Sequence, residues 1–222
     1  MLPANLLKKI AETMDGRVPC PDVELIMITN SMETTDLNLV NLFANHQLKA
    51  LGEYQQAQTN KNGIRLRYLE HQFTVDASSH LSLHSKVMIL GDDMFIGSAN
   101  ADVRSLMMDT NNGLFISRSP ASTADYQKWL QGLINKGHIA PPKVNVINES
   151  RESLLLRDMA FLDTMISKYQ VQQWLSRQQS QQLKNKFRTL LDETYILSRD
   201  IISKGGDADA AAKRFNALFK TI

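Results

Sequence analysis

Two pairs of polar residues could together bind and transfer a phosphate group. His84 and Lys86 stand two positions apart, and Ser98 and Asn100 repeat that spacing directly after Gly97, which would let backbone or a ligand approach closely. Because alternate side chains of a β-strand share one face, each pair is expected to project to one side, and the four groups could converge on a small anion. Lysine supplies charge, serine and asparagine donate hydrogen bonds, and histidine can act as nucleophile or proton carrier near neutral pH. These residue types fit phosphoryl transfer without a metal.

The sequence around the two pairs predicts the strands that would hold them. The stretches 81–90 and 93–100 look like two strands joined by a Gly91-Asp92 turn. A further strand is predicted at 112–117, after a polar loop, and a helix follows at 122–134.

Upstream of this region, helical and strand patterns alternate. Apolar residues at helical spacing predict helices over 5–14 and 34–54, and apolar or alternating runs predict strands over 23–29 and 64–71. A strand, helix, strand order favours a parallel arrangement. We therefore expect an α/β fold, with a mixed, mostly parallel sheet flanked by helices.

The last third of the chain predicts helices. Residues 150–203 are almost wholly helical in pattern, after a linker with a Pro pair, so we expect a sheet domain over 1–140 and a helical extension over 141–222. From Arg151 onward the chain has 12 Lys+Arg and 8 Asp+Glu. This basic tail could contact a membrane or a partner. We favour the alternative that it forms two amphipathic helices packed on the sheet or on another chain.

The composition is that of a soluble globular protein. The 222 residues are 43% hydrophobic and carry a net charge of +2, too little to indicate nucleic acid or an anionic membrane by charge alone. Cys20 is the only cysteine, so an intramolecular disulfide is excluded. No signal peptide or membrane span is evident, and we expect a location in the cytoplasm or at the surface of an inner membrane.

The motif residues also resemble a known family. His84, Lys86, Gly97, Ser98 and Asn100 are similar to the HKD motif of the phospholipase D superfamily, H-x-K-x4-D-x6-G-S-x-N. The flanking stretches LIMITNSMETTD and SANADVRSLMMDTNNGLFI resemble the C-terminal half of bacterial cardiolipin synthase-type enzymes. The resemblance covers roughly residues 23 to 140.

The resemblance implies phosphodiester transfer or hydrolysis on phospholipids, with no metal or cofactor. One histidine forms a phosphohistidine and a second protonates the leaving alcohol, so each active site needs two motifs. This chain contains one, in which His84 would be the acid/base partner, Lys86 and Asn100 would hold phosphate oxygens and Ser98 would assist. The implied partners are a phospholipid substrate and a second HKD-bearing chain, either an identical copy in a homodimer or another protein.

Three departures from the family pattern bear on this interpretation. The motif aspartate has no clean equivalent, because Gly91 falls in its slot with Asp92 directly after it. Asn111 stands where related enzymes often place a glutamate that supports the catalytic histidine, and a neutral amide stabilises an imidazolium less. The strand that usually opens the domain is also missing.

These departures leave two alternatives. The chain could be a catalytically impaired half that binds phosphate ligands or a catalytic partner. A homodimeric nuclease of the same superfamily is disfavoured because the surface is barely cationic. A metal site built from His80, Asp92 and Asp93 is also disfavoured, since acidic residues at a hairpin are usually solvated turn residues.

Overall fold

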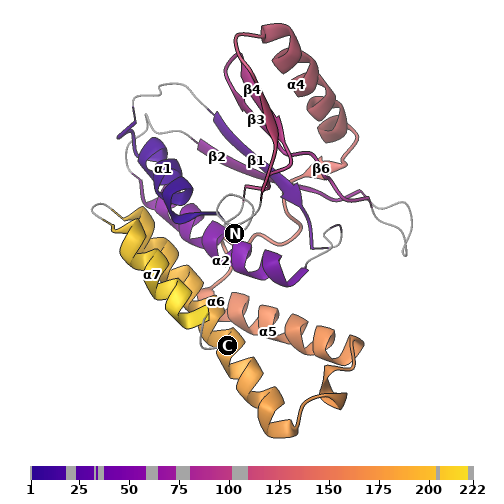
Figure 1. The fold of residues 1–222 in the computed structure, drawn as a ribbon, viewed down its shortest axis with the longest axis vertical. Coiled ribbons are helices and arrows are strands. Elements are labelled where there is room, and N and C mark those ends of the chain that lie inside the picture. The colour runs from indigo at the N-terminus through magenta and orange to yellow at the C-terminus, as the bar shows by residue number, and fades with distance from the viewer. Residues whose placement is uncertain are drawn as a thin grey trace. The chain divides into compact units, whose positions relative to one another are not determined.

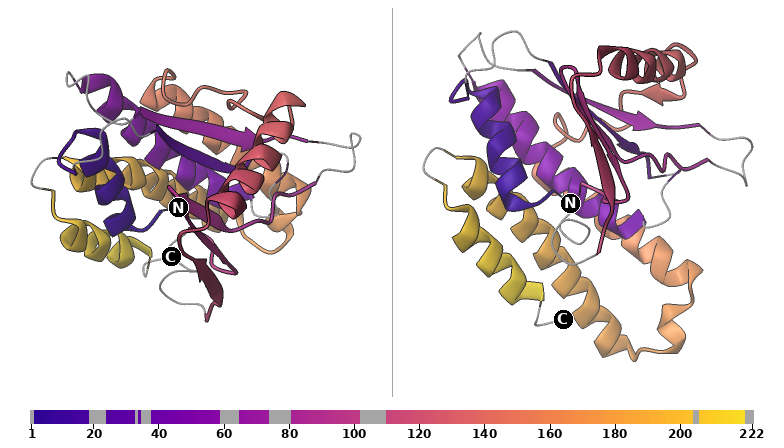
Figure 2. Two further views of the ribbon diagram at one scale, coloured as in Figure 1. Left: turned by 90° about the horizontal axis from the view of Figure 1, so that it is seen from above. Right: turned by 45° about the horizontal axis from the view of Figure 1, so that its top comes forward.

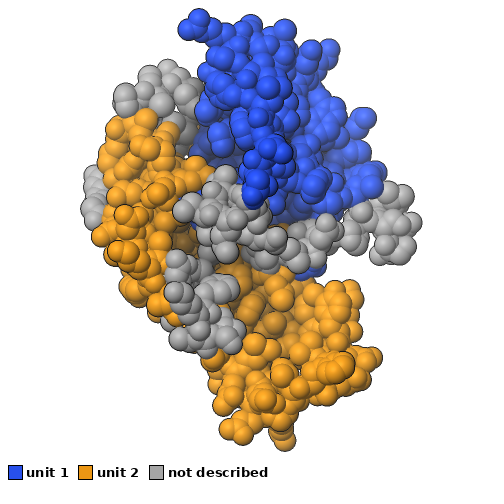
Figure 3. All heavy atoms as spheres, in the orientation of Figure 1, with its two compact units in different colours: residues 1–3, 24–38, 66–143 blue, residues 4–23, 39–65, 144–222 orange. Residues whose placement is uncertain are grey.

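The structure is a computed structural model, and its residues form two compact units (Figure 3). Unit 1 combines Met1–Pro3, Glu24–Asn38 and Leu66–Lys143, and unit 2 combines Ala4–Val23, Leu39–Arg65 and Val144–Ile222. The structure describes residues 2–18, 24–32, 34, 38–58, 65–73, 81–101, 110–203 and 206–219. Cys20, His80 and the 102–109 part of the family-like stretch lie outside the described residues.

Unit 1 contains two small sheets and a helix. One sheet has the order β1 (Glu24–Asn30), β2 (Arg65–His71), β6 (Ile139–Ala140), and the other has the order β3 (Val87–Leu90), β4 (Asp93–Gly97), β5 (Gly113–Ile116). Helix α4 (Pro120–Asn135) packs against β4 and β6.

The mixed α/β class is confirmed, but a mostly parallel sheet is not shown. Within the described residues, every strand pair with a defined register is antiparallel: β2 with β6, β3 with β4, and β4 with β5. A two-residue turn between β3 and β4 is too short for a parallel crossover. The linker expected before the helical extension also contributes β6, whose two residues pair with Glu70 and His71.

The hairpin of β3 and β4 fixes the position of the motif residues. Val87 pairs with Ile96 and Leu90 pairs with Asp93, around a turn at which Gly91 has a φ of 63°. This positive φ suits glycine and the tight connection that the sequence predicted. The first strand is shorter than expected, because β3 begins at Val87 and the segment with His84 and Lys86 precedes it.

Unit 2 is helical. It contains α1 (Ala4–Met14), most of α2 (Asn38–Ala57), α5 (Arg151–Lys168), α6 (Arg177–Ile202) and α7 (Ala208–Phe219), with a short 3₁₀ helix η1 (Val171–Gln173) between α5 and α6. Helix α6 packs against α1, α5 and α7 (Figures 1 and 2). The fully buried core of this unit includes Leu7, Leu51, Leu154 and Leu191. The predicted C-terminal helices are present, and α1 and α2 belong to the same unit as these helices.

The helix boundaries follow from local signals. The Ser150 hydroxyl accepts a hydrogen bond from the amide of Ser153 at the start of α5, and Ser176 and Gln179 form a reciprocal capping box at the start of α6. Gln170 ends the α5 turn with a φ of 53°. Across the part of the chain that the structure describes, no helix combines the length and the apolar character that crossing a bilayer requires.

Candidate functional site

Asn30, at the end of β1, fixes the segment that carries His84. Its Oδ1 accepts a hydrogen bond from the amide of Leu83 at 2.7 Å, and its Nδ2 donates to the Leu83 carbonyl and the Ser82 hydroxyl, both at 3.0 Å. The amide side chain thus pairs with the Leu83 backbone as a neighbouring strand would. His84 follows directly and is exposed to solvent.

The residues after Asn30 join β1 to β2. Ser31 donates its amide to the carbonyl of His71 at 3.0 Å, and the buried Thr34 donates its hydroxyl to the same carbonyl at 2.8 Å. The Ser31 and Thr34 hydroxyls lie 3.2 Å apart. This part of the family-like stretch therefore holds the strand ends in place.

Lys86 is tied to the backbone of the motif. Its Nζ donates to the carbonyl of His84 at 2.8 Å, and its own carbonyl accepts the amide of Gly97 at 3.0 Å. The side chain is half-buried, and this burial lowers the pKa of Lys86 below its ordinary value because the charged form loses solvation. An anion bound at this ammonium would raise the pKa of Lys86 again, because it favours the charged form.

Ser98 closes the far end of the hairpin against the strand β5 segment. Its amide donates to the carbonyl of Asn112 at 2.8 Å, and its hydroxyl accepts the amide of Asn112 at 2.9 Å. The same hydroxyl lies 3.1 Å from Oδ1 of Asn111, to which it can donate its single proton. Asn111 is therefore a partner of Ser98.

Gly97 makes room for a protein side chain. A Cβ at Gly97 would lie 2.8 Å from the ring of Phe95, and one at Gly113, its partner on β5, would also collide with that ring. The Phe95 ring thus covers both glycines on one face of the sheet. The space that the sequence suggested for a ligand is filled by this ring, and the sequence analysis missed Phe95.

The structural aspartate of the hairpin is Asp93 rather than Asp92. The Asp93 Oδ1 accepts the hydroxyl of Ser117 at 3.0 Å and the amide of Arg118 at 2.8 Å, so it anchors the chain that leaves β5. Asp92 contributes its backbone carbonyl, which accepts the amide of Ser119 at 2.9 Å, and its side chain is exposed. The carboxylate lies one residue further along the chain than expected.

The strand register separates two of the predicted site residues. The ladder places Lys86 opposite Gly97, and Ser98 opposite Asn112. Because alternate residues face opposite sides, Lys86 and Ser98 stand on opposite faces, which differs from the expected convergence. The two-residue turn sets this register, and a shift of one residue would have placed Ser98 on the other face.

The remaining two predicted residues are accessible. His84 and Asn100 are both exposed, and neither side chain has a hydrogen-bond partner among the residues that the structure describes. The chain therefore presents the imidazole of His84 to solvent close to Lys86, whose charge is partly desolvated, and it also exposes the amide of Asn100. An imidazole and an ammonium group this close in the chain can transfer a proton and bind an anion.

Within the described ranges, no three His, Cys, Asp or Glu side chains come together as metal ligands would. Comparison with known proteins gives no further guidance, since no family, curated protein or solved structure matches this chain.

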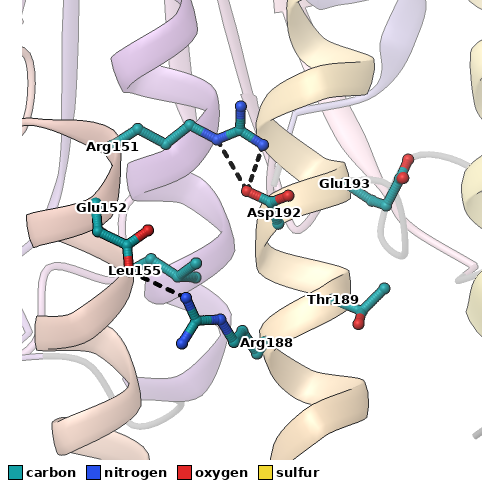
Figure 4. Close-up of a pocket in the computed structure, with 7 residues that line it drawn as sticks. All are labelled: Arg151, Glu152, Leu155, Arg188, Thr189, Asp192 and Glu193. Carbon is teal, nitrogen blue, oxygen red and sulfur yellow. Dashed lines mark hydrogen bonds and ion pairs between the residues drawn. The ribbon is translucent and has the colours of Figure 1, made fainter.

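A polar pocket lies between α5 and α6, away from the motif residues in the sequence (Figure 4). Its two arginines already have acidic partners: Arg151 binds Asp192, and Arg188 binds Glu152 at 3.1 Å. Glu193 points away from both arginines (Figure 4). Both guanidinium groups are thus neutralised, and the two ion pairs that line the pocket connect α5 to α6.

A buried polar network in unit 2 was missed by the sequence analysis. His46 of α2 and Asp158 of α5 are almost fully buried, with Nε2 and Oδ2 3.1 Å apart. Arg157 connects Asp158, at 3.2 Å, with Glu149, at 2.6 Å. These contacts hold α2, α5 and the preceding loop together.

Lys49 extends the network on the same face of α2. Its buried Nζ donates to the carbonyls of Ile147 and Glu149 at 3.3 and 2.5 Å and lies 3.0 Å from Glu53. The spacing of His46, Lys49 and Glu53 on one helical face was the available signal. The network stabilises the helices, and no part of it is needed for the candidate site.

Proposed function

We propose that this chain is a phospholipase D-type half that hydrolyses or transfers phosphodiesters of phospholipids, with His84 as the acid/base histidine. The observation that carries the proposal is the exposed His84 held between the Asn30 clamp on Leu83 and the backbone contact of Lys86. A rigid backbone with an accessible imidazole is what a proton-transferring histidine needs. The choice of phosphodiester chemistry rests on the resemblance of the motif residues to the HKD motif.

The proposed reaction has two steps and requires a histidine from a second chain. A nitrogen of that histidine forms a bond to phosphorus while the bond to the leaving alcohol oxygen breaks, and His84 gives that oxygen a proton. Water or an acceptor alcohol then attacks phosphorus and returns a proton to His84, and the phosphorus–nitrogen bond breaks. Lys86 would turn from the His84 carbonyl to a phosphate oxygen, where the opposite charge favours the ammonium form.

The hydrogen bonds suggest different roles for Ser98 and Asn100. The Ser98 hydroxyl is occupied by Asn111 and Asn112, so we assign Ser98 a positioning role at the end of the hairpin. Asn100 is exposed and its amide can donate to a phosphate oxygen. The proposed phosphate ligands are thus Lys86 and Asn100.

The test is headgroup release from phosphatidylglycerol by the purified chain, together with its mass in solution. We expect turnover by an assembly of two motif-bearing chains, and its loss in His84→Ala. Ser85→Ala, at the exposed neighbouring position, is the matched control and should retain turnover. A monomeric chain whose turnover does not depend on His84 would refute the proposal.

A second candidate, a phosphate-binding half without catalysis, is favoured by the contact between Asn111 and Ser98. A neutral amide at Asn111 provides less support for an imidazolium than a carboxylate would. Phosphate-dependent NMR shifts at His84 without turnover would favour this candidate. If Asn111→Glu gains turnover, the chain is instead a weakened enzyme.

A further inference from the structure

The turn between α5 and α6 carries the most exposed aromatic residue of the described chain. Trp174 has 83% of its surface exposed and Tyr169 has 62% exposed, on either side of η1. We call residues 168–177 the aromatic tip. It lies at one end of unit 2, where α5 gives way to α6 (Figures 1 and 2). Two large aromatic side chains exposed within one short turn leave apolar surface that a partner could cover.

The charged residues close to the aromatic tip in the sequence are all basic. Residues 164–191 contain five Lys or Arg and no Asp or Glu. Lys184 is paired with Asp163 and Arg188 with Glu152, both outside that stretch. Lys168 and Arg177 are the first and last residues of the tip, and neither has a carboxylate partner among the residues that the structure describes.

This combination narrows the chemistry of the partner. Tryptophan and tyrosine favour the boundary between lipid headgroups and acyl chains, and nearby Lys and Arg are attracted to anionic headgroups. Single-stranded nucleic acid would instead require a continuous basic groove with several stacking residues. The stretch between Lys168 and Arg177 is uncharged and rich in glutamine, which does not supply such a groove.

We propose that the aromatic tip docks on an anionic lipid surface, with Trp174 and Tyr169 at the headgroup level and Lys168 and Arg177 bound to lipid phosphates. This deepens the proposed function, on which the choice of a lipid partner partly rests. Such docking would raise the local concentration of a phospholipid substrate without any contact to His84.

The direct test uses Trp174 as its own reporter. The chain has two tryptophans, so Trp129→Phe leaves Trp174 as the single fluorophore. With vesicles of phosphatidylcholine and phosphatidylglycerol in equal parts, we expect a blue shift of the emission and quenching by brominated acyl chains. Vesicles of phosphatidylcholine alone should give little change, and added salt should weaken binding.

Two variants test the two parts of the proposal by vesicle sedimentation. Trp174→Ala with Tyr169→Ala, and separately Lys168→Gln with Arg177→Gln, should each lower partitioning to the mixed vesicles roughly tenfold or more. Lys128→Gln with Lys136→Gln makes the same charge change at exposed positions of unit 1 and should retain wild-type binding.

The outcomes separate this inference from the proposed function. His84→Ala should bind the mixed vesicles as the wild type does, whatever its effect on turnover. A Trp174 emission that is unchanged by the vesicles overturns the docking proposal, even if turnover depends on His84. A Trp174 response to a single-stranded oligonucleotide but not to vesicles also overturns it.

Discussion

The side chain of Asn30 and the backbone of Leu83 form a closed ring of two hydrogen bonds, with Leu83 N to Oδ1 at 2.7 Å and Nδ2 to Leu83 O at 3.0 Å. The two residues are far apart in the sequence, and His84 comes directly after the ring. Asn30 therefore fixes the segment that contains His84, the proposed catalytic group, to the end of β1.

Replacement of Asn30 should affect turnover more than its contribution to stability would suggest. Asn30→Asp removes the donor to the Leu83 carbonyl and places a negative charge beside it, so we expect at least a tenfold loss of turnover and a destabilisation of about 1–2 kcal/mol. Urea unfolding and headgroup release measure the two effects. Ser82→Ala removes one hydrogen bond to Asn30 but leaves the ring, and should have little effect. Equal losses in both variants would contradict the positioning role.

Gly97 should be intolerant of a side chain. In Gly97→Ala the new methyl group would meet the Phe95 ring at 2.8 Å and the Asn112 carbonyl at 2.9 Å, so we expect a destabilisation of about 1–3 kcal/mol. Gly132→Ala is the contrasting control, because nothing lies within 4 Å and the position is helical. It should stabilise the chain by about 0.5–1 kcal/mol in thermal or urea unfolding. A neutral Gly97→Ala would show that the ring can move aside.

The two hairpin aspartates should respond differently to substitution. Asp93→Ala removes the acceptor for the Ser117 hydroxyl and the Arg118 amide, and should cost about 1–2 kcal/mol of unfolding free energy. Asp92→Ala leaves the backbone bond to Ser119 intact and should be close to neutral. Urea denaturation compares the pair. The reverse ranking would reassign the structural role to Asp92.

His71 should make unit 1 less stable in mild acid. Burial, and the nearby His138, lower the pKa of His71 below its ordinary value of 6.5, because both disfavour the imidazolium. The unfolded chain therefore binds a proton that the folded chain does not, and stability should fall as the pH drops through 6.5, levelling off below the folded pKa.

The measurement is the pH dependence of the unfolding free energy with and without His71. His71→Leu keeps the backbone carbonyl that Ser31 and Thr34 bind, and should flatten the decline between neutral and mildly acidic pH. If the unfolding free energies of the variant and the wild type fall in parallel as the pH drops, His71 is not the group that makes stability depend on pH.

The features that the sequence predicted well are those with local causes. The helices 5–14 and 150–203 and the hairpin around Gly91 depend on periodicity, caps and one turn, all visible within a few residues. The two-residue strand β6 was missed because it has no pattern of its own and exists only through pairing with β2. The two prolines that follow it had indicated a linker.

The site was predictable as a set of residue types but not in its geometry. The register that places Lys86 and Ser98 on opposite faces depends on one residue of turn length, which spacing alone does not reveal. The buried face of α2 was missed for another reason. Lys49 is normally a surface residue, and its burial depends on carbonyls about a hundred positions away.

That capture of loop carbonyls by Lys49 has a consequence for biosynthesis. As the nascent chain leaves the ribosome, α2 emerges long before Ile147, Glu149 and Asp158, which complete its buried polar face. Until translation reaches the last third of the chain, the Lys49 ammonium lacks the carbonyls to which it donates in the folded protein. Unit 2 can therefore complete its packing only late in synthesis. If the gene were divided after the motif-bearing segment, neither fragment would contain all of unit 2.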